Sequence, residues 1–205
     1  LLDGLLSWGA QGIALCALND IMIEARVNEL AEQGIPCITF NSDLPESRRV
    51  CFVGQDYAKS GRIAAELLSK CIPQNGKVLA MVGNMEYNGH RTRLDGFCAH
   101  LHDKGFYADQ IEVVETYNDY RVTYNKVTEA LHNMPGLRAI YMANRSVTGC
   151  IVADKAAGMT GQIRVIAHDM SPRRRQMLRE GSLDLTITQD LYRQGYQPLM
   201  LLCDL

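Results

Sequence analysis

The chain has 205 residues, a formal net charge of −2 at pH 7, 47% hydrophobic residues and 21% charged residues. This composition is typical of a globular protein, and the length allows one large domain or two small ones. The small charge gives no general attraction to nucleic acid or anionic membrane, and no apolar run is long enough to span a bilayer, so neither partner is expected for this chain itself.

The first part of the chain predicts strand, helix, strand and then a second strand. Residues 12–18 form a continuous apolar run, as expected for a strand buried on both faces. Helical periodicity covers residues 21–33, and residues 36–40 and 50–53 predict two strands with no helical pattern between them. This break in the alternation favours a crossing into a second, similar sheet, although a single doubly wound sheet of this size is also possible.

A regular alternation of strands and helices follows. Strands are predicted over residues 77–82, 111–115, 137–143, 164–169 and 185–190, and helices over residues 57–71, 90–104, 120–133, 147–157, 172–180 and 192–205. Short loops between alternating strands and helices imply a parallel sheet with helices on both faces. The predicted class is therefore α/β with parallel, doubly wound sheets.

Polar side chains follow most of the predicted strands. They are Asn41, Asp43, Asn118, Asp119, Asn144, His168, Asp169, Gln189 and Asp190. Any one of the Asn or Asp residues could simply cap the next helix. Ligands of open α/β sheets bind beyond the carboxyl ends of the strands, however, and a ring of amides and carboxylates suits the hydroxyls of a sugar. Tyr117, Phe40 and Tyr141 are candidates to cover a sugar ring, with core packing as the alternative.

Arginines give two further signals. Arg91 follows the loop after a strand, where it can aim a forked donor at a ligand or pair with Asp95 one helical turn later. The run of Arg173, Arg174 and Arg175 opens a helix in a nearly neutral chain, so a solvated helix face is preferred over a nucleic-acid site.

Signals for catalysis and cofactors are weak. No GxGxxG, GxxxxGK[ST] or GxSxG motif is present. The acids Asp43, Asp119 and Asp169 could serve an enzyme, but no nucleophile, metal cluster or cofactor loop accompanies them. The seven cysteines are odd in number and none are spaced as CxxC, which favours free thiols in a reducing cytosol over disulfides or zinc. We therefore expect a cytoplasmic, non-enzymatic protein with no catalytic residue, metal or cofactor.

The set of motifs resembles the ligand-binding core of the LacI family of bacterial transcription regulators and of the related type I periplasmic sugar-binding proteins. The motifs occur in the family's order at residues 34–43, 52–56, 61–65, 91–97, 143–144, 167–169 and 188–190. The resemblance implies a two-lobed periplasmic-binding-protein-like fold. Residues 1–54 and 190–205 would form an N-terminal lobe, incomplete in this chain, and residues 55–189 a C-terminal lobe.

The resemblance also implies ligand contacts and a function. Contacts carry over to Asn41 or Asp43, Arg91, Asn144, Asp169 and Gln189, while Asn118 and His168 stand at positions that are often aromatic or aliphatic in the family. Arg145 replaces a frequent acid, which suggests an atypical ligand.

The expected function is an effector-binding core of a LacI-type regulator. A sugar-like effector would close the lobes and thereby control DNA binding. The implied partners are that effector, a second identical subunit, and operator DNA through a helix-turn-helix domain that this chain lacks. The alternative is a periplasmic sugar-binding protein of an ABC transporter.

Overall fold

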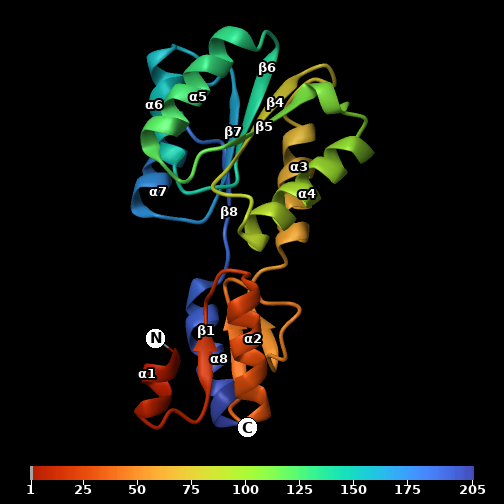
Figure 1. The fold of residues 1–205 in the computed structure, drawn as a ribbon. Helices are drawn as coiled ribbons and strands as arrows, with labels where there is room; N and C mark the ends of the chain where they lie inside the picture. The colour runs from red at the N-terminus through yellow and green to blue at the C-terminus, as the bar shows by residue number, and fades with distance from the viewer. Residues whose placement is uncertain (1) are drawn as a thin grey trace. The chain divides into compact units, whose positions relative to one another are not determined.

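The chain divides into two compact units. The computed structural model describes residues 2–205, so the first residue of the predicted N-terminal lobe lies outside the described residues. The smaller unit holds the described residues up to Gln55, residues 87–89 and residues 190–205, and the larger unit holds residues 56–86 and 90–189. Each unit is built on its own parallel sheet (Figure 1), so the predicted α/β class with parallel sheets is confirmed.

The smaller unit has a three-stranded sheet in the order β1-β2-β3, formed by β1 (Ile13–Leu15), β2 (Cys37–Phe40) and β3 (Cys51–Val53). Helices α2 (Ile21–Glu32) and α8 (Leu191–Cys203) pack on these strands, and the short α1 is Leu2–Ser7. Asp20 caps α2 by accepting hydrogen bonds from the backbone N–H groups of Met22 and Ile23. The core of this unit is formed by Ile13, Val27, Leu30, Cys37 and Leu44.

The larger unit has a five-stranded sheet in the order β5-β4-β6-β7-β8. The strands are β4 (Lys77–Val82), β5 (Ile111–Glu115), β6 (Leu137–Met142), β7 (Arg164–His168) and β8 (Leu185–Ile187). The helices are α3 (Tyr57–Ser69), α4 (Asn88–Asp103), α5 (Tyr120–Asn133), α6 (Val147–Ala156) and α7 (Pro172–Arg179), with a short 3₁₀ helix, η1, at Ala108–Gln110. The predicted helices and strands are all present, and their ends differ by a few residues.

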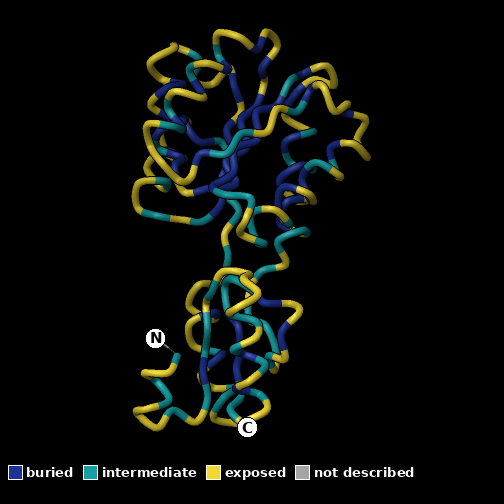
Figure 2. The backbone as a smooth tube through the Cα atoms, viewed as in Figure 1, coloured by how far each residue is buried: buried dark blue, intermediate teal, exposed yellow. Residues whose placement is uncertain are grey.

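The central strands β4, β6 and β7 of the larger sheet are buried on both faces, as Figure 2 shows by its dark segments. Side chains of α3 and α4, including Leu68 and Phe97, pack with one face of the strands. Side chains of α5, α6 and α7, including Val127, Cys150 and Met177, pack with the other. This two-sided burial explains why the strands read as continuous apolar runs in the sequence.

The strand order places a switch point beside β4. The chain leaves β4 to form β5 on one side and returns to form β6 on the other, so the carboxyl ends of β4 and β6 flank the place where the connections diverge. In open α/β sheets this is where a crevice for ligands forms. The polar residues that follow these strands therefore lie at the edge where a ligand is expected.

Helices α3 and α4 approach each other closely through two glycines. A Cβ atom on Gly61 would lie 2.0 Å from the carbonyl oxygen of Arg93, and one on Gly96 would lie 2.3 Å from the carbonyl oxygen of Ala58. Both contacts are with backbone, which cannot move aside as a side chain can. The glycines therefore set the separation of the two helices that cover this face of the sheet.

We expect Gly61→Ala to destabilise the larger unit by about 1–3 kcal/mol, because the added methyl overpacks the helix contact. Urea unfolding followed by circular dichroism measures the change. Gly195→Ala is the matched control, since Gly195 is also helical and its Cβ would meet nothing within 4 Å. That variant should be equally or more stable, because alanine favours a helix by about 1 kcal/mol over glycine. An unchanged unfolding midpoint for Gly61→Ala would contradict the close packing.

Candidate ligand-binding site

Six of the predicted contact residues lie at the carboxyl-end edge of the larger sheet. Asn118 follows β5, Asn144 follows β6, His168 ends β7 with Asp169 next, Gln189 follows β8, and Arg91 is in the first turn of α4. Asn41 and Asp43 follow β2 in the smaller unit. The parallel topology thus brings the six together on one unit, as the strand-end pattern predicted.

Asn144 has a buried oxygen that lacks a donor. The residue is 5% exposed, and its Nδ2 donates to Thr116 Oγ1, which in turn donates to the carbonyl oxygen of Val82 at 2.9 Å. Its Oδ1 is buried and has no hydrogen-bond partner among the described residues. An unpaired buried acceptor costs about 1–3 kcal/mol, so this atom at the switch point calls for a donor such as a ligand hydroxyl.

Strained backbone gathers at the strand ends. Among the described residues, the non-glycine positions with positive φ are Asn41 (58°), Tyr117 (52°), Asn118 (58°) and Asp169 (65°). All four lie just beyond β2, β5 or β7. Asn and Asp tolerate this left-handed conformation better than other residues, whereas for Tyr117 it costs on the order of 1 kcal/mol. Such strain persists only where the surroundings hold it in place.

Arg174 holds two of these strand-end loops. Its guanidinium donates to the carbonyl oxygens of His168 at 2.6 Å, of Asp169 at 3.3 Å and of Arg145 at 3.2 Å. Half-burial lowers the pKa of Arg174, the carboxylate of Asp169 opposes that shift, and Arg145 adds to it. One cation therefore ties the loop after β6 to the loop after β7. The interpretation of residues 173–175 as a wholly solvated face is wrong for Arg174, while Arg173 and Arg175 are exposed.

The remaining loops join the same network. Asn118 Oδ1 accepts from the backbone N–H of Arg145 at 2.9 Å, which connects the loops after β5 and β6. Gln189 Nε2 donates to Asp169 Oδ1 at 2.8 Å, and Thr186 Oγ1 donates to the carbonyl oxygen of Asp169 at 2.8 Å. Side chains thus link the ends of β5, β6, β7 and β8 in order.

His168 faces the core rather than solvent. It is 2% exposed, and its Nε2 lies 2.8 Å from the hydroxyl of Tyr141, whose ring stacks on Phe97 at 3.9 Å. Burial, followed by the charges of Arg93 and Arg174, lowers the pKa of His168 to about 2, so the ring is neutral at pH 7. Tyr141 is fully buried in this stack, so core packing is its role, while Tyr117 is 66% exposed.

Arg91 does not pair with Asp95. Its Nε donates to the carbonyl oxygen of Met85 at 3.1 Å, and among the described residues it makes no ion pair with Asp95. The residue is exposed at the start of α4. Of the two interpretations of Arg91, the helix-surface ion pair is therefore excluded.

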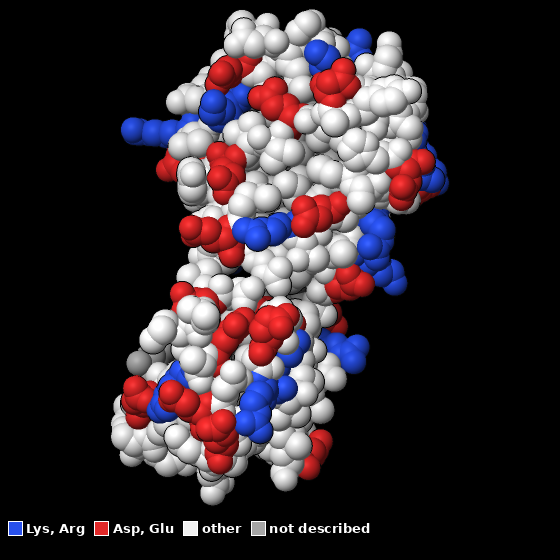
Figure 3. Space-filling view, turned by 45° about the vertical axis from the view of Figure 1, so that its right-hand side comes forward, with Lys and Arg blue, Asp and Glu red and all other residues white. Residues whose placement is uncertain are grey.

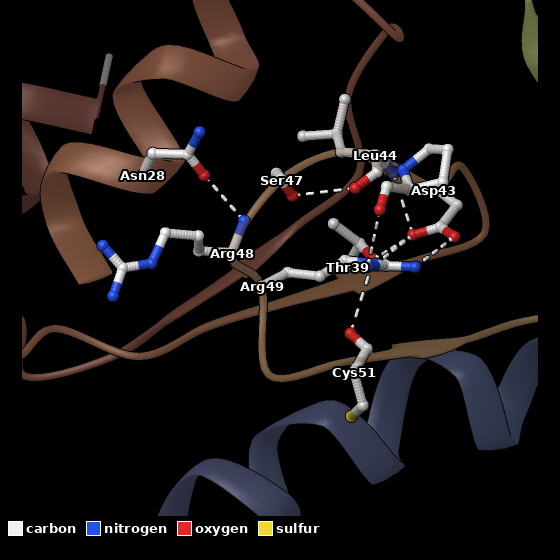
Figure 4. Close-up of polar contacts among 9 residues, drawn as sticks. Asn28, Thr39, Asp43, Leu44, Ser47, Arg48, Arg49 and Cys51 are labelled. Atoms are coloured by element: carbon white, nitrogen blue, oxygen red, sulfur yellow. Dashed lines mark hydrogen bonds and ion pairs between the residues drawn. The ribbon is translucent and has the colours of Figure 1, made fainter. Parts of the chain in front are cut away.

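Asp43 is engaged within the smaller unit, as Figure 4 shows. Its carboxylate receives Arg49 Nε at 2.5 Å and Nη2 at 2.7 Å, together with the hydroxyl of Thr39 and the backbone N–H of Leu44. The Asp43 and Arg49 side chains are only 19% and 20% exposed. Asp43 is thus a structural anchor of the loop after β2. Asn41 Nδ2 donates to Gln194 Oε1 at 3.0 Å.

Helix capping explains two other strand-end acids. Asp119 Oδ1 accepts from the backbone N–H of Val122 and caps α5, and Asp190 Oδ1 accepts from that of Arg193 and caps α8. Asn118, Asn144 and Asp169 form no such caps. The capping alternative therefore holds for Asp119 and Asp190 and fails for the other three.

The sequence-based reasoning missed Arg174 and Thr116. Arg174 lies three and four residues before Met177 and Leu178, which pack against the core, so helical spacing singles it out from its two neighbours. Thr116 carried no signal of its own, because a buried threonine at a strand end resembles any other strand residue.

We expect Arg174→Gln to destabilise the larger unit by about 1–3 kcal/mol, because hydrogen bonds from a charged donor to three carbonyl oxygens are lost. Urea unfolding measures the stability, and amide hydrogen exchange at residues 144–146 and 168–171 measures the loosening of the loops. Arg175→Gln, which changes an exposed neighbour on the same helix, should leave both unchanged. Equal effects of the two substitutions would contradict the clamp.

A double-mutant cycle of Asp43→Asn and Arg49→Gln tests the structural role of Asp43. Each single change should cost about 1–2 kcal/mol, and the double change should cost clearly less than the sum, because the partners share one interaction. Chemical unfolding supplies the four free energies. Additive losses would mean that the pair in Figure 4 contributes no coupling.

Curated proteins with similar sequences include sugar-binding proteins. The xylose/arabinose-binding protein XylF of Sulfolobus acidocaldarius is 21% identical over 97% of this chain and 52% of its own length. The D-allose-binding periplasmic protein of Escherichia coli is 24% identical over 95% of this chain and 65% of its own length. The chain thus spans about half to two thirds of these curated relatives.

A solved structure supports the same fold. An ABC transporter solute-binding protein from Burkholderia graminis, in complex with D-arabinose, superposes with a TM-score of 0.88 at 22% identity, covering 98% of this chain and 71% of that one. At this identity the likeness establishes the fold. The predicted periplasmic-binding-protein-like fold is therefore confirmed.

The predicted cytoplasmic location is wrong. The Escherichia coli relative is named as a periplasmic protein, the Burkholderia graminis structure as a solute-binding protein of an ABC transporter, and the Sulfolobus relative as a sugar-binding protein; none of the three is named as a cytoplasmic regulator. The prediction rested on free cysteines and on the regulator half of the resemblance. LacI-type regulators and periplasmic sugar-binding proteins share the same ligand-binding core, so the resemblance does not separate them. The cysteine count does not separate them either.

A family model settles the classification. The model, described as a periplasmic binding protein domain, matches residues 1–205. It is a family of binding proteins rather than enzymes, in agreement with the expectation of no catalysis. No helix among the described residues is long and apolar enough to cross a membrane. The chain belongs to the periplasmic binding protein domain family.

Proposed function

We propose that this chain is the sugar-binding core of a transporter-type solute-binding protein. The observation that carries the proposal is the buried Asn144 Oδ1, which lacks a donor at the switch point of a sheet edge lined by amides and a carboxylate. A sugar hydroxyl supplies such a donor. The names of the relatives, which include xylose-, arabinose- and allose-binding proteins, support the same class of ligand.

In the proposed site, some residues of the larger unit contact the sugar and others position those contacts. Asn144 Oδ1 accepts a hydrogen bond from one sugar hydroxyl, and the Asp169 carboxylate accepts hydrogen bonds from others. Arg91 donates hydrogen bonds to the sugar from the first turn of α4. Gln189 and Asn118 hold Asp169 and the backbone of Arg145 through their side-chain hydrogen bonds, so they position the contacts. Hydroxyls both donate and accept, which is why a mixed set of donors and acceptors suits a sugar. The contributions of His168, Asn41 and Asp43 to ligand contact stay predictions.

The LacI-type regulator is the weaker candidate. It has the same ligand core, but the curated relatives above are named as binding proteins. The homodimer and the operator-DNA partner that it implies stay predictions, and light scattering of the full-length protein measures the first of them.

A ligand screen tests the proposal. The full-length protein is screened by thermal shift with xylose, arabinose, ribose, allose, glucose and galactose, each at about 10 mM. A sugar that binds only the folded state, at a concentration 100 times its Kd, stabilises the protein by about 2.7 kcal/mol and raises Tm by several degrees. Calorimetry then gives the Kd. No Tm rise with any sugar or sugar derivative would refute the proposal.

Arg91→Ala should weaken sugar binding about ten-fold or more, because a charged donor to the ligand is lost. Tm without ligand should stay within a degree or so, since Arg91 is exposed and makes one hydrogen bond to a backbone carbonyl oxygen. Arg138→Ala, an exposed arginine on β6 near its amino end, is the control and should keep full affinity. Unchanged affinity in Arg91→Ala would remove Arg91 from the site.

A further inference from the structure

Three arginines at the edge of the larger sheet lack a carboxylate partner. Among the described residues, Arg91 donates to one backbone carbonyl oxygen, Arg174 donates to three, and the guanidinium of Arg145 makes no hydrogen bond or ion pair. Elsewhere, Arg49 pairs with Asp43 and Arg164 pairs with Asp184. Acidic and basic side chains are interspersed over the face shown in Figure 3.

The acids at this edge are already engaged by donors. Glu115 Oε1 accepts from the backbone N–H of Met85 at 2.7 Å, Asp119 Oδ1 from that of Val122 at 2.9 Å, and Asp169 Oδ1 from Gln189 Nε2 at 2.8 Å. None of the three forms an ion pair within the part of the chain that the structure describes. The guanidinium charges are therefore not offset by direct contact with these acids.

Nearby arginines contribute to the lowered pKa values of two histidine rings, His90 and His168. Burial is the largest cause that lowers the pKa of His90; a hydrogen bond with the Asn84 backbone opposes it, and Arg93 and Arg145 lower it further. Burial also dominates at His168, where Arg93 and Arg174 lower the pKa further. Arginine side chains thus contribute to the lowered pKa of both rings. The rings lie beside the ends of β4 and β7, on either side of β6, so these arginines lie within electrostatic reach of the switch point.

We propose that the edge of the larger unit binds a polyhydroxylated anion, a sugar bearing a carboxylate or a phosphate, with Arg145 as the residue that selects the negative charge. Two independent features meet in such a ligand. The buried Asn144 Oδ1 lacks a donor, which a sugar hydroxyl supplies, and the guanidinium of the next residue, unpaired among the described residues, offers a forked site for an oxyanion. A neutral sugar satisfies the first feature and leaves the second unused.

The position of Arg145 is well defined although its side chain is unpaired. Its backbone N–H donates to Asn118 Oδ1 at 2.9 Å, and its carbonyl oxygen accepts from Arg174 at 3.2 Å. Both backbone groups are held from neighbouring loops, so the side chain projects from a fixed point beside Asn144. This inference rests on the proposed function, since it names the class of sugar that the same site takes.

Calorimetry of the full-length protein at low ionic strength tests the inference with matched ligands: D-glucose, D-glucuronate and D-glucose 6-phosphate, and D-ribose with D-ribose 5-phosphate. We expect at least one anion to bind about ten-fold or more tightly than its neutral counterpart, since a charged hydrogen bond adds to the hydroxyl contacts. The preference should shrink as salt is raised, because screening weakens charge attraction. Which anion binds distinguishes carboxylate from phosphate.

Arg145→Gln should lower the ratio of anion affinity to neutral-sugar affinity about ten-fold, and Arg145→Lys should restore part of it because the charge returns. Arg173→Gln, an exposed arginine on α7, is the matched control and should leave the ratio unchanged. Tighter binding of neutral sugars, or an equal loss for both ligand classes in Arg145→Gln, overturns this inference and leaves the proposed function standing. Absence of binding by every ligand overturns both.

Discussion

Within residues 2–205, the guanidinium of Arg174 donates to three backbone carbonyl oxygens and to no carboxylate, and these contacts hold together the loops after β6 and β7. Carbonyl groups in the loops beyond the strands have no neighbouring strand to donate to them. A half-buried cation satisfies three of them at once. Because those carbonyls lie at the end of β7 and in the loops after β6 and β7, the same contacts hold Asn144 and Asp169, two of the proposed ligand contacts, in a fixed relation. Charge-assisted hydrogen bonds of this kind are about twice as strong as neutral ones.

Each strand-end residue of the larger unit has a distinct task that follows from where its hydrogen bonds go. The Asp119 carboxylate caps the amino end of α5, where it accepts a hydrogen bond from an otherwise unpaired N–H group. Asn118 is turned the other way by its left-handed backbone and reaches the backbone of Arg145 instead. Asp169 combines a positive φ with contacts to Thr186, Arg174 and Gln189, which together hold a conformation that would otherwise be disfavoured. The strain at these tips is thus balanced by side-chain contacts from neighbouring loops.

The fold could be predicted from the sequence because burial on both faces of a parallel sheet leaves continuous apolar runs, and because amphipathic helices separate them. Strand-end positions such as Asn144 and Asp169 followed from the same pattern. The direction of a side chain could not be predicted, because it depends on the packing and hydrogen-bond partners that the fold places around it. His168 was assigned to the ligand edge, yet it turns into the core beside Tyr141. Asp43 was a ligand candidate, yet an arginine six residues later occupies its carboxylate. The predicted location was wrong because a cysteine count does not report how the thiols are placed. Cys37 and Cys150 are buried in the cores, where they pack as small apolar side chains, whereas Cys16, Cys71 and Cys203 are exposed.

The preformed edge also bears on how the larger unit would discriminate between ligands. The side chains that tie the loops together are committed to one another, and their hydrogen-bonding atoms are not free to adapt to different guests. Groups held in advance lose little entropy on binding, so most of their interaction energy is available to the complex. In the proposed site, discrimination then falls largely to atoms outside the network, among them the buried Asn144 Oδ1 and the Arg145 guanidinium. The first rejects any guest without a donor at that point, because a buried acceptor left unpaired is costly. The second distinguishes guests by charge, so adjacent residues on one loop read two independent chemical properties of the same molecule.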